Sequence, residues 1–476
     1  MIFSSFEFLF LFLPIVLILI ALYRNITYQN TILFISSILF YAWGGVSYTL
    51  IILASIIINY FSGIYIGKSS KKKLWLSVAV VLNLGLLFFF KYFNFMVDNY
   101  NLLTSIFHIS PVTVRRIILP IGISFYTFQG LSYIIDVYRK VVEPQHNFIK
   151  LGTFIALFPQ LIAGPIIRYH ELESQLTQRK LSVTNFYDGM KRFMFGLARK
   201  VIIANQIAVM VDDIFSRAPE EISILTAWVG IIGYTLQIYH DFAGYSDMAI
   251  GLGKMLGFTF PENFNYPYLA KSIQQFWQRW HITLSTWFKN YLYFPLGGSR
   301  CSPKRVLLNL YIVFFLTGLW HGASWNFVIW GLIHGTFIVL ERQGLSRLLA
   351  KSFGFVQHLY ALFIIMISRV FFRADDLTTA INYMKALFGC SNPTEQNITI
   401  YRYFSLDFIL ILIIAILSST KFFELINNQI NKLTLRYKYV FHLKYILVAI
   451  GIIIVLFIVI NQLVTGTYNP FIYYRF

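Results

Sequence analysis

The chain has 476 residues, of which 57% are hydrophobic and only 12% are charged. A soluble globular protein needs far less apolar material for its core, so the composition excludes that class and indicates a membrane protein with many spans. The formal net charge of +19 does not indicate a nucleic-acid partner, because the basic residues gather in loops between apolar runs, where membrane topology explains them.

Apolar runs divide the sequence into candidate spans, each of which needs about 20 residues to cross a bilayer. Several runs are short, so we expect an all-α polytopic fold with about ten to twelve transmembrane helices and additional re-entrant or interfacial helices. The first run lacks a basic leader and a cleavage site, which predicts an anchor rather than a removed signal peptide. The runs are residues 8–23, 31–43, 50–66, 74–92, 117–137, 201–211, 225–250, 306–320, 327–340, 359–372, 408–417 and 445–464.

The basic loops predict the orientation of the chain. If alternate loops are cytoplasmic, the basic clusters all lie on that side, as the positive-inside rule requires, and both termini lie outside. Lys91, Arg115 and Arg116 are exceptions in a predicted outer loop. Cys301 and Cys390 are expected on opposite sides and should not form a disulfide. The basic clusters are residues 68–73, 139–140, 168–200, 254–305, 342–351 and 421–444.

Proline, glycine and polar side chains interrupt three apolar stretches, residues 119–130, 158–169 and 239–248. Polar backbone is tolerated at membrane depth only where it is buried in protein or lines an aqueous cavity. Gln129 and Gln160 lie in the first two stretches and are candidates to line such a cavity. The third stretch places two carboxylates and a histidine in one span without a balancing base nearby. These interruptions predict an internal cavity rather than a simple bundle.

Residues 271–294 carry apolar side chains with the i, i+3, i+4, i+7 spacing of an amphipathic helix. We expect that helix to lie along the cytoplasmic face of the membrane. His281 falls on the edge of its apolar stripe, from which a side chain could look into a cavity. Periodicity alone favours an incidental boundary histidine over a functional one.

His321 lies in the segment 317–326, inside the otherwise apolar run 306–340. An ionisable group at that depth is costly and usually faces a protein-lined cavity, so it is a candidate functional residue. A buried histidine that bonds a backbone carbonyl and holds two helices together is an equally good interpretation. Gly318 and Gly322 would allow another helix to approach closely at the same level.

Three tryptophans accompany His321 at intervals of five residues: Trp320, Trp325 and Trp330. Residues at that interval do not share one helical face, so we expect them to wall a site or to mark interfaces. His334 would point about 220° away from His321 if one helix continued, and we interpret it as structural.

Five segments together resemble the membrane-bound O-acyltransferase family, and within it the bacterial branch of alginate O-acetylation. They follow the family's order over nearly the whole chain and are residues 1–8, 158–165, 276–285, 318–322 and 469–476. The resemblance implies a ring of helices around a central tunnel, in the bacterial inner membrane. It implies an enzyme that moves an acetyl group from acetyl-coenzyme A toward hydroxyls of an envelope polysaccharide, such as alginate or peptidoglycan. The family's essential histidine falls on His321 and its second histidine on His281.

The chemistry of histidine suits that role, because acyl transfer to a hydroxyl needs a base that is neutral near pH 7. No G-x-S-x-G motif occurs in the sequence, so histidine-assisted direct transfer is expected rather than an acyl-enzyme. Neither a metal nor a permanently bound cofactor is expected. The expected tunnel-lining residues are Trp320, Trp325, Asn326, Trp280, Arg279, Gln129 and Gln160.

The resemblance also bears on domains and partners. We expect one integral-membrane domain, residues 1–476, with peripheral helices in 1–115, catalytic core helices in 116–340 and C-terminal helices in 341–476. The outer loop 375–403 is too short for a glycan-binding domain, which takes 50 residues or more. A separate extracytoplasmic acetyltransferase is therefore an expected partner, besides membrane lipid and the polysaccharide.

Two other functions remain open. D-alanyl transfer to teichoic acid from a carrier protein is an activity of the same family. A non-enzymatic polysaccharide or lipid transporter would also be polytopic with a polar interior, but no internal repeat of the kind such transporters carry is evident.

Overall fold

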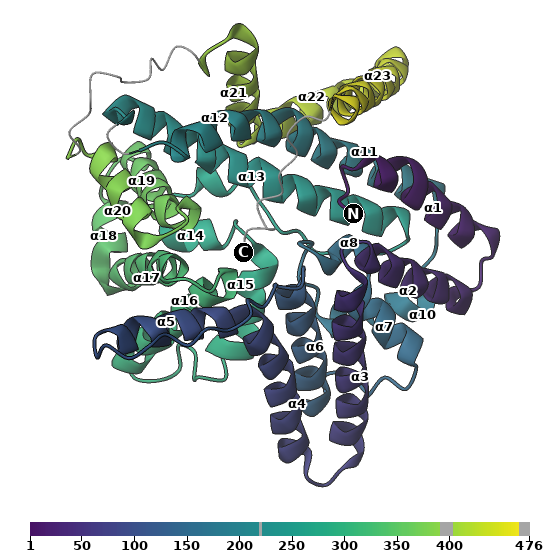
Figure 1. Cartoon of the computed structure of the whole chain (residues 1–476). Helices are drawn as coiled ribbons and strands as arrows, with labels where there is room; N and C mark the ends of the chain where they lie inside the picture. The colour runs from purple at the N-terminus through teal and green to yellow at the C-terminus, as the bar shows by residue number, and fades with distance from the viewer. Residues whose placement is uncertain (219–220, 391–402, 466–476) are drawn as a thin grey trace.

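Helices make up the regular structure throughout the described residues, 1–218, 221–390 and 403–465, of this computed structural model (Figure 1). No strand occurs in those ranges. The closing segment 469–476 and residues 391–402 of the predicted outer loop lie outside them. The all-α prediction is thereby confirmed for the part of the chain that the structure describes.

Two long helices, α3 (Val46–Lys68) and α4 (Lys72–Leu87), form a hairpin that packs on α6 (Ile123–Tyr138). Reciprocal amide bonds hold the hairpin together inside this apolar layer, since Asn59 Nδ2 donates to Asn83 Oδ1 at 3.0 Å and Asn83 Nδ2 returns a bond at 3.2 Å. Figure 1 shows the hairpin projecting from the body of the molecule.

The helix α4 does not end where the apolar run does. It continues through a π-helical turn, η2 (Phe88–Tyr92), into α5 (Phe93–Ser105), so that residues 72–105 form one helix of 34 residues. The prediction that Lys91 lies in an outer loop is therefore wrong: it is buried inside this helix. Its ammonium group finds acceptors on a neighbouring helix, which is why the helix tolerates it. Arg116 does lie in a segment without regular secondary structure, paired with Asp98 at 2.7 Å.

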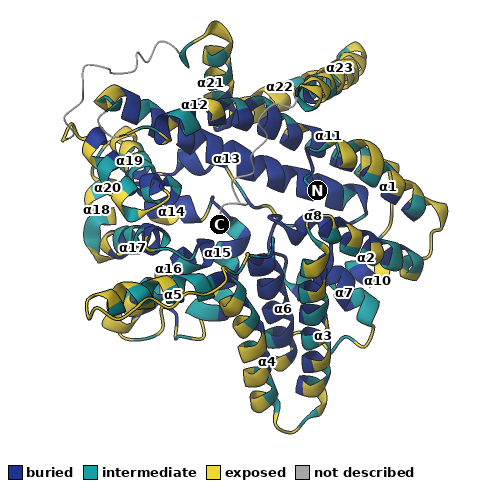
Figure 2. Cartoon of the chain, viewed as in Figure 1, coloured by how far each residue is buried: buried dark blue, intermediate teal, exposed yellow. Residues whose placement is uncertain are grey.

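The helix α13 (Ile224–Met255), 32 residues long, packs along α11 (Val183–Ala198), η3 (Arg199–Ala204) and α12 (Asn205–Phe215). Glycines make the contact close: a Cβ at Gly196 would lie 2.5 Å from Gly244 O, and one at Gly189 would lie 2.6 Å from Gly251 O. Small residues at such crossings let backbones approach within a membrane. Figure 2 shows α13 buried along most of its length.

The prediction of an interruption at 239–248 is wrong, because α13 runs through that stretch without a break. Its carboxylates are balanced from η3 and α11 rather than by neighbours in sequence. Lys200 Nζ lies 2.5 Å from Asp241, and Asp247 pairs with Arg192 at 2.9 Å and Arg199 at 2.8 Å. The interruptions at 119–130 and 158–169 are confirmed. In the first stretch, α6 starts only after Gly122, whose backbone lies in the left-handed region at φ 77°. The second stretch holds the short helix α8 (Phe158–Leu161) and the start of α9 (Tyr169–Leu172).

The prediction of one amphipathic helix over 271–294 is also wrong, because the helix is broken within this segment. It forms α14 (Ile273–Trp277), α15 (Ile282–Phe288) and the π-helical turn η6 (Lys289–Tyr293). Tertiary bonds replace helical ones at the break, where Ile282 N donates to Asn263 O at 3.0 Å and Asn265 N donates to Arg279 O at 2.9 Å. Its apolar residues face the protein core instead of a membrane surface.

The helical hairpin of α16 (Pro303–His321) and α17 (Trp325–Leu340) follows, and α19 (Gly354–Arg373) packs on α17 and on α13. The chain then runs through α20 (Leu377–Leu387) to α21 (Leu406–Ser418), α22 (Phe422–Arg436) and α23 (Lys438–Val464). The other helices are η1 (Phe8–Phe12), α1 (Leu13–Leu22), α2 (Ile26–Ala42), α7 (Phe148–Ala156), α10 (Gln175–Gln178), η5 (Pro267–Leu269), η7 (Glu341–Leu345) and α18 (Ser346–Ala350).

Five helices within the described residues are long and apolar enough to cross a membrane, or six if the bent pair of α21 and α22 counts as one span. The predicted ten to twelve spans are therefore not confirmed, since α13 and α16 are not among these five. Exposed apolar side chains on α3, α4 and α23 (Figure 2) agree with a multi-pass membrane protein. The five are Val46–Lys68, Lys72–Ser105, Val183–Phe215, Gly354–Arg373 and His442–Val464. Cys301 and Cys390 are both free, as predicted.

Candidate functional site

His321 is the last residue of α16 and is only 3% exposed. Its ring packs against aromatic rings from three helices: the centroid distances are 5.0 Å to Trp320, 4.9 Å to Trp330 and 5.2 Å to Phe372. Trp330 reaches it because α17 approaches α16 closely at Gly318, as the glycine spacing predicted. The site is thus built at a helix crossing.

His281 lies at the break between α14 and α15, in the left-handed region at φ 43°, and is completely buried. Its ring meets Phe242 of α13 edge-on at 4.7 Å, Trp320 at 5.8 Å and the His321 ring at 6.5 Å between centroids. The prediction that His281 lies at the edge of the apolar stripe of one helix is wrong, because the backbone leaves the helix at this residue. The fold nevertheless brings together the two histidines that the sequence singled out.

A hydrogen-bond network fixes the orientation of the His281 ring. Asn263 Oδ1 accepts from the Thr283 amide at 3.3 Å and from its hydroxyl at 2.8 Å, so this atom is an acceptor. The His281 nitrogen 3.0 Å away, Nδ1, must then carry a proton and donate it to Asn263. Nε2 has no hydrogen-bond partner among the described residues. In the neutral ring Nε2 is therefore an acceptor, which suits taking up a proton rather than stabilising an oxyanion.

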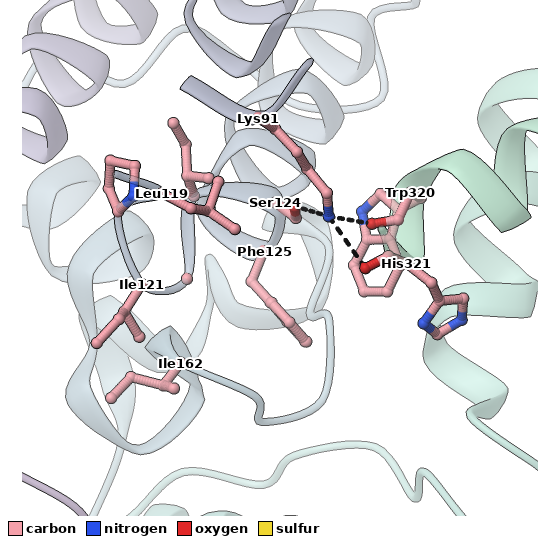
Figure 3. Close-up of a pocket in the computed structure, with 11 residues that line it drawn as sticks. Lys91, Leu119, Ile121, Ser124, Phe125, Ile162, Trp320 and His321 are labelled. Atoms are coloured by element: carbon pink, nitrogen blue, oxygen red, sulfur yellow. Dashed lines mark hydrogen bonds between the residues drawn. The ribbon is translucent and has the colours of Figure 1, made fainter. Parts of the chain in front are cut away.

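A small cavity of about 70 Å³ reaches His321 from the side of its backbone. In Figure 3 the imidazole points away from this cavity, whereas its carbonyl oxygen faces Lys91. The remaining wall comes from the start of α6, including Ser124 and Phe125, and from Ile162. The cavity therefore gives access to the end of α16 and not directly to the ring.

A second, larger cavity of about 600 Å³ also has Trp320 in its wall, and its lining is almost wholly apolar. Trp320 and Tyr291 are both part of its wall, and Tyr291 also borders a polar cavity of about 500 Å³ that contains Arg139 and Arg168. Trp320 contacts both histidine rings and lines the larger apolar cavity, whereas neither histidine lines it. The central tunnel that the resemblance implies stays a prediction.

Arg369 of α19 is a site residue that the sequence reasoning missed. It is 1% exposed, and its guanidinium lies 4.2 Å from the Trp280 ring centroid and 5.4 Å from that of Phe372. Its Nε and Nη2 atoms have no hydrogen-bond partner among the described residues. A lone arginine in an apolar span was a signal in the sequence, because charge at that depth is costly.

The predicted lining residues divide into two groups. Trp320 and Trp280 belong to the aromatic shell around the histidines. Trp325 does not: it is 52% exposed and its indole donates to Asn99 at 2.8 Å. Asn326 is buried but donates to a backbone carbonyl of α19's end, Ala374 O, and Arg279 donates to Asn265 O. These two contacts indicate structural roles.

Gln129 and Gln160 are fully buried. Gln160 donates to Phe154 O at 2.6 Å. Within the described residues, the side-chain amide of neither glutamine is hydrogen-bonded to His281 or His321. His334 is nearer the site than predicted, because the chain turns at the residues before α17 instead of continuing as one helix. It shares Trp330 with His321, at 5.0 Å between ring centroids, and Ser368 Oγ lies 3.0 Å from its Nε2.

The carboxylates of the stretch 239–248, which looked functional in the sequence, belong to another part of the structure. The carboxylates of α13 are held in ion pairs with α11 and η3, as described above. Within the described residues no three histidine, cysteine, aspartate or glutamate side chains cluster as metal ligands would. The functional groups near His321 are imidazole rings, a guanidinium, an ammonium group and indoles.

These features define a multi-pass membrane protein whose helices enclose a pair of buried histidines. The sequence profile of the membrane-bound O-acyltransferase family matches residues 140–374. The chain is 43% identical over 393 residues to a probable alginate O-acetylase of Pseudomonas aeruginosa, an alignment that covers 82% of this chain and 75% of that protein. It is 36% identical over 427 residues to a peptidoglycan O-acetyltransferase of Helicobacter pylori, covering 82% and 80%.

A more distant relative is a teichoic acid D-alanyltransferase of Bacillus subtilis, 31% identical over 231 residues, or 46% of this chain and 58% of that one. The extent of the first two alignments decides the assignment. The chain belongs to the membrane-bound O-acyltransferase family, and it is an acyltransferase.

Proposed function

We propose that this protein takes an acetyl group from acetyl-coenzyme A at the cytoplasmic face of the inner membrane for O-acetylation of an envelope polysaccharide. The observation that carries the proposal is the meeting of His281 and His321, 6.5 Å apart between ring centroids inside one aromatic shell. The relatives named above as O-acetylases and O-acetyltransferases support the acyl group and the kind of acceptor.

In the proposed reaction the acceptor hydroxyl oxygen attacks the carbonyl carbon of the thioester. The hydroxyl proton passes to the imidazole of His321 as the new C–O bond forms. The C–S bond then breaks, and the leaving sulfur takes up that proton, so that an ester and a free thiol result. His281, which has an acceptor at Nε2, orients the attacking hydroxyl or shares the work of the base.

The relatives also support an alternative, D-alanyl transfer, but the teichoic acid D-alanyltransferase aligns with less than half of this chain. The test is transfer of labelled acetyl groups by purified protein in vesicles that are supplied, on the side opposite acetyl-coenzyme A, with glycan and the extracytoplasmic acetyltransferase expected as partner. Wild-type protein should transfer acetyl from acetyl-coenzyme A, and His321→Ala should reduce the rate by at least about 1,000-fold, as loss of a general base together with its positioning does. The exposed His146 provides the control His146→Ala, with unchanged activity expected. Wild-type activity in His321→Ala would refute the assignment.

The final acceptor and the partner belong to the same proposal. Because the outer segments are short, we propose that a separate extracytoplasmic acetyltransferase receives the acetyl group and passes it to the glycan. Vesicles with acetyl-coenzyme A on the cytoplasmic side and glycan on the other should form little ester until that partner is added. Efficient acetylation without it would refute the relay and leave direct transfer.

A further inference from the structure

The last turn of α16 ends in carbonyl groups that helical bonding leaves without partners, as at any helix C-terminus. Two consecutive residues of the neighbouring helix satisfy them. The Tyr92 hydroxyl donates to Leu319 O at 2.8 Å, and the Lys91 ammonium donates to Trp320 O and, at 3.3 Å, to His321 O. Three successive carbonyls are thus capped from outside α16, and we call Lys91 and Tyr92 the clamp.

The environment of Lys91 explains how a membrane helix tolerates its charge. The side chain is only 8% exposed, and its three protons meet three acceptors, the third being Ser124 Oγ at 3.1 Å (Figure 3). A cation at the C-terminus of a helix also meets the negative end of the helix dipole. Lys91 forms no ion pair with a carboxylate in the described ranges. The end of α16 is therefore its electrostatic partner.

The local helix geometry places both clamp residues on the same target. Lys91 and Tyr92 close the π-helical turn Phe88–Tyr92, which joins α4 to α5. A turn of this kind inserts a residue into an α-helix and is frequent at functional sites. Consecutive side chains diverge by about 100° around an α-helix, yet Lys91 and Tyr92 both reach the last turn of α16.

The carbonyls that the clamp holds are those on either side of the site histidine. Trp320 O belongs to the peptide plane before the His321 Cα, and His321 O belongs to the plane after it. One ammonium group therefore restrains both backbone torsions from which the imidazole projects, while the ring itself points to the opposite side, as Figure 3 shows. Loss of the ammonium would free the final residue of α16, where helices fray.

We infer that Lys91 and Tyr92 are positioning residues for His321, and that they fix its ring for proton transfer without contacting the substrate. This inference rests on the proposed function, in which His321 is the base. The predicted effect falls on the chemical step, because a base displaced by about 1 Å loses about 100-fold in rate. Binding of the acyl donor should be unaffected.

The experiment compares Lys91→Met, Lys91→Arg and Tyr92→Phe with the control Tyr100→Phe, which changes an exposed tyrosine of the same long helix. In the vesicle assay described above, with the partner and glycan supplied, Lys91→Met should lower kcat about 100-fold with an unchanged KM for acetyl-coenzyme A. Lys91→Arg should restore part of kcat, and Tyr92→Phe, which loses one hydrogen bond, should lower it about tenfold.

A purely structural role predicts a different result: a lower thermal unfolding midpoint and less protein, but a wild-type kcat per folded molecule in both Lys91→Met and Lys91→Arg. That result would overturn the inference. If Lys91→Met does not fold, Tyr92→Phe decides, since a wild-type kcat in that variant also excludes the clamp. His321→Ala measured alongside separates the two hypotheses. If it is active, the proposed base is wrong; if it is inactive while both clamp variants are fully active, only the positioning role is wrong.

Discussion

Substitution of Gly318 by alanine tests whether the close contact between α16 and α17 builds the site. A Cβ at this position would lie 2.3 Å from Phe327 O and 3.1 Å from its carbonyl carbon, whereas ordinary contacts begin near 3.4 Å. The obstacle is backbone, so no side chain can rotate away to relieve it. The two helices must separate by about 1 Å at this level.

The expected consequences follow from that displacement. Overpacking of this kind costs about 1–3 kcal/mol of stability. The displacement also carries Trp330 away from the His321 ring. In the wild type the centroids of the two rings are 4.9 Å apart. Misplacement of about 1 Å costs about 100-fold in rate. Gly318→Ala should therefore lower both the thermal unfolding midpoint in detergent and the acetyl transfer rate per folded molecule.

The matched control is Gly85→Ala in α4, where an added Cβ meets no heavy atom within 4 Å. That variant should keep the activity of the wild type, with equal or slightly higher stability, since alanine favours helix over glycine. If Gly318→Ala matches Gly85→Ala in both measurements, the crossing of α16 and α17 does not constrain the site, and the reasoning is refuted.

Four further predictions concern other parts of the site and the topology. His281→Ala should lower kcat less than loss of the proposed base does, and Asn263→Leu should lower kcat about tenfold, because the ring then lacks the bond that fixes its tautomer; equal activity in Asn263→Leu and wild type would exclude that role. Arg369→Met should lower the transfer rate at least about tenfold at normal protein levels, with no rescue by Arg369→Lys, since stacking on an indole favours guanidinium. Cysteines replacing Lys71 and Arg300 in a cysteine-free background should resist an impermeant thiol reagent applied to whole cells, and strong labelling would reverse the predicted orientation.

Hydropathy identified the membrane class and the positions of most apolar helices, because burial in lipid leaves a strong compositional mark. It failed where tertiary bonds decide the backbone. The stripe over 271–294 has a helical period, yet bonds to the segment at Asn263 break the helix and turn His281 inward. Periodicity reports which side chains are apolar. It carries no information about a second backbone segment that competes for the hydrogen bonds of the helix.

The site itself could be predicted only in part. His321 and Trp320 were recognisable because a polar ring between aromatic residues is unusual in an apolar run. Arg369 and Lys91 were equally unusual as single charges in apolar helices, but the first was not considered and the second was assigned to a loop. Trp325 lies apart from the histidine rings, since its indole donates to Asn99, but it lines the same apolar cavity as Trp320, and its predicted lining role stays a prediction.

The pairing of buried charges separates structural from functional candidates in this protein. On α13 each carboxylate that looked functional in the sequence has a basic partner, as Asp241 has in Lys200, and such pairs hold helices together. Near the histidines the cations lack carboxylate partners among the described residues: Lys91 contacts the carbonyls that end α16, and Arg369 stacks on indole and phenyl rings. Positive charge kept without neutralising carboxylates favours negative charge beside it, and a carbonyl under attack by a hydroxyl develops such charge. The buried charges around His321 therefore suit the proposed transfer, whereas those of α13 are explained by packing alone.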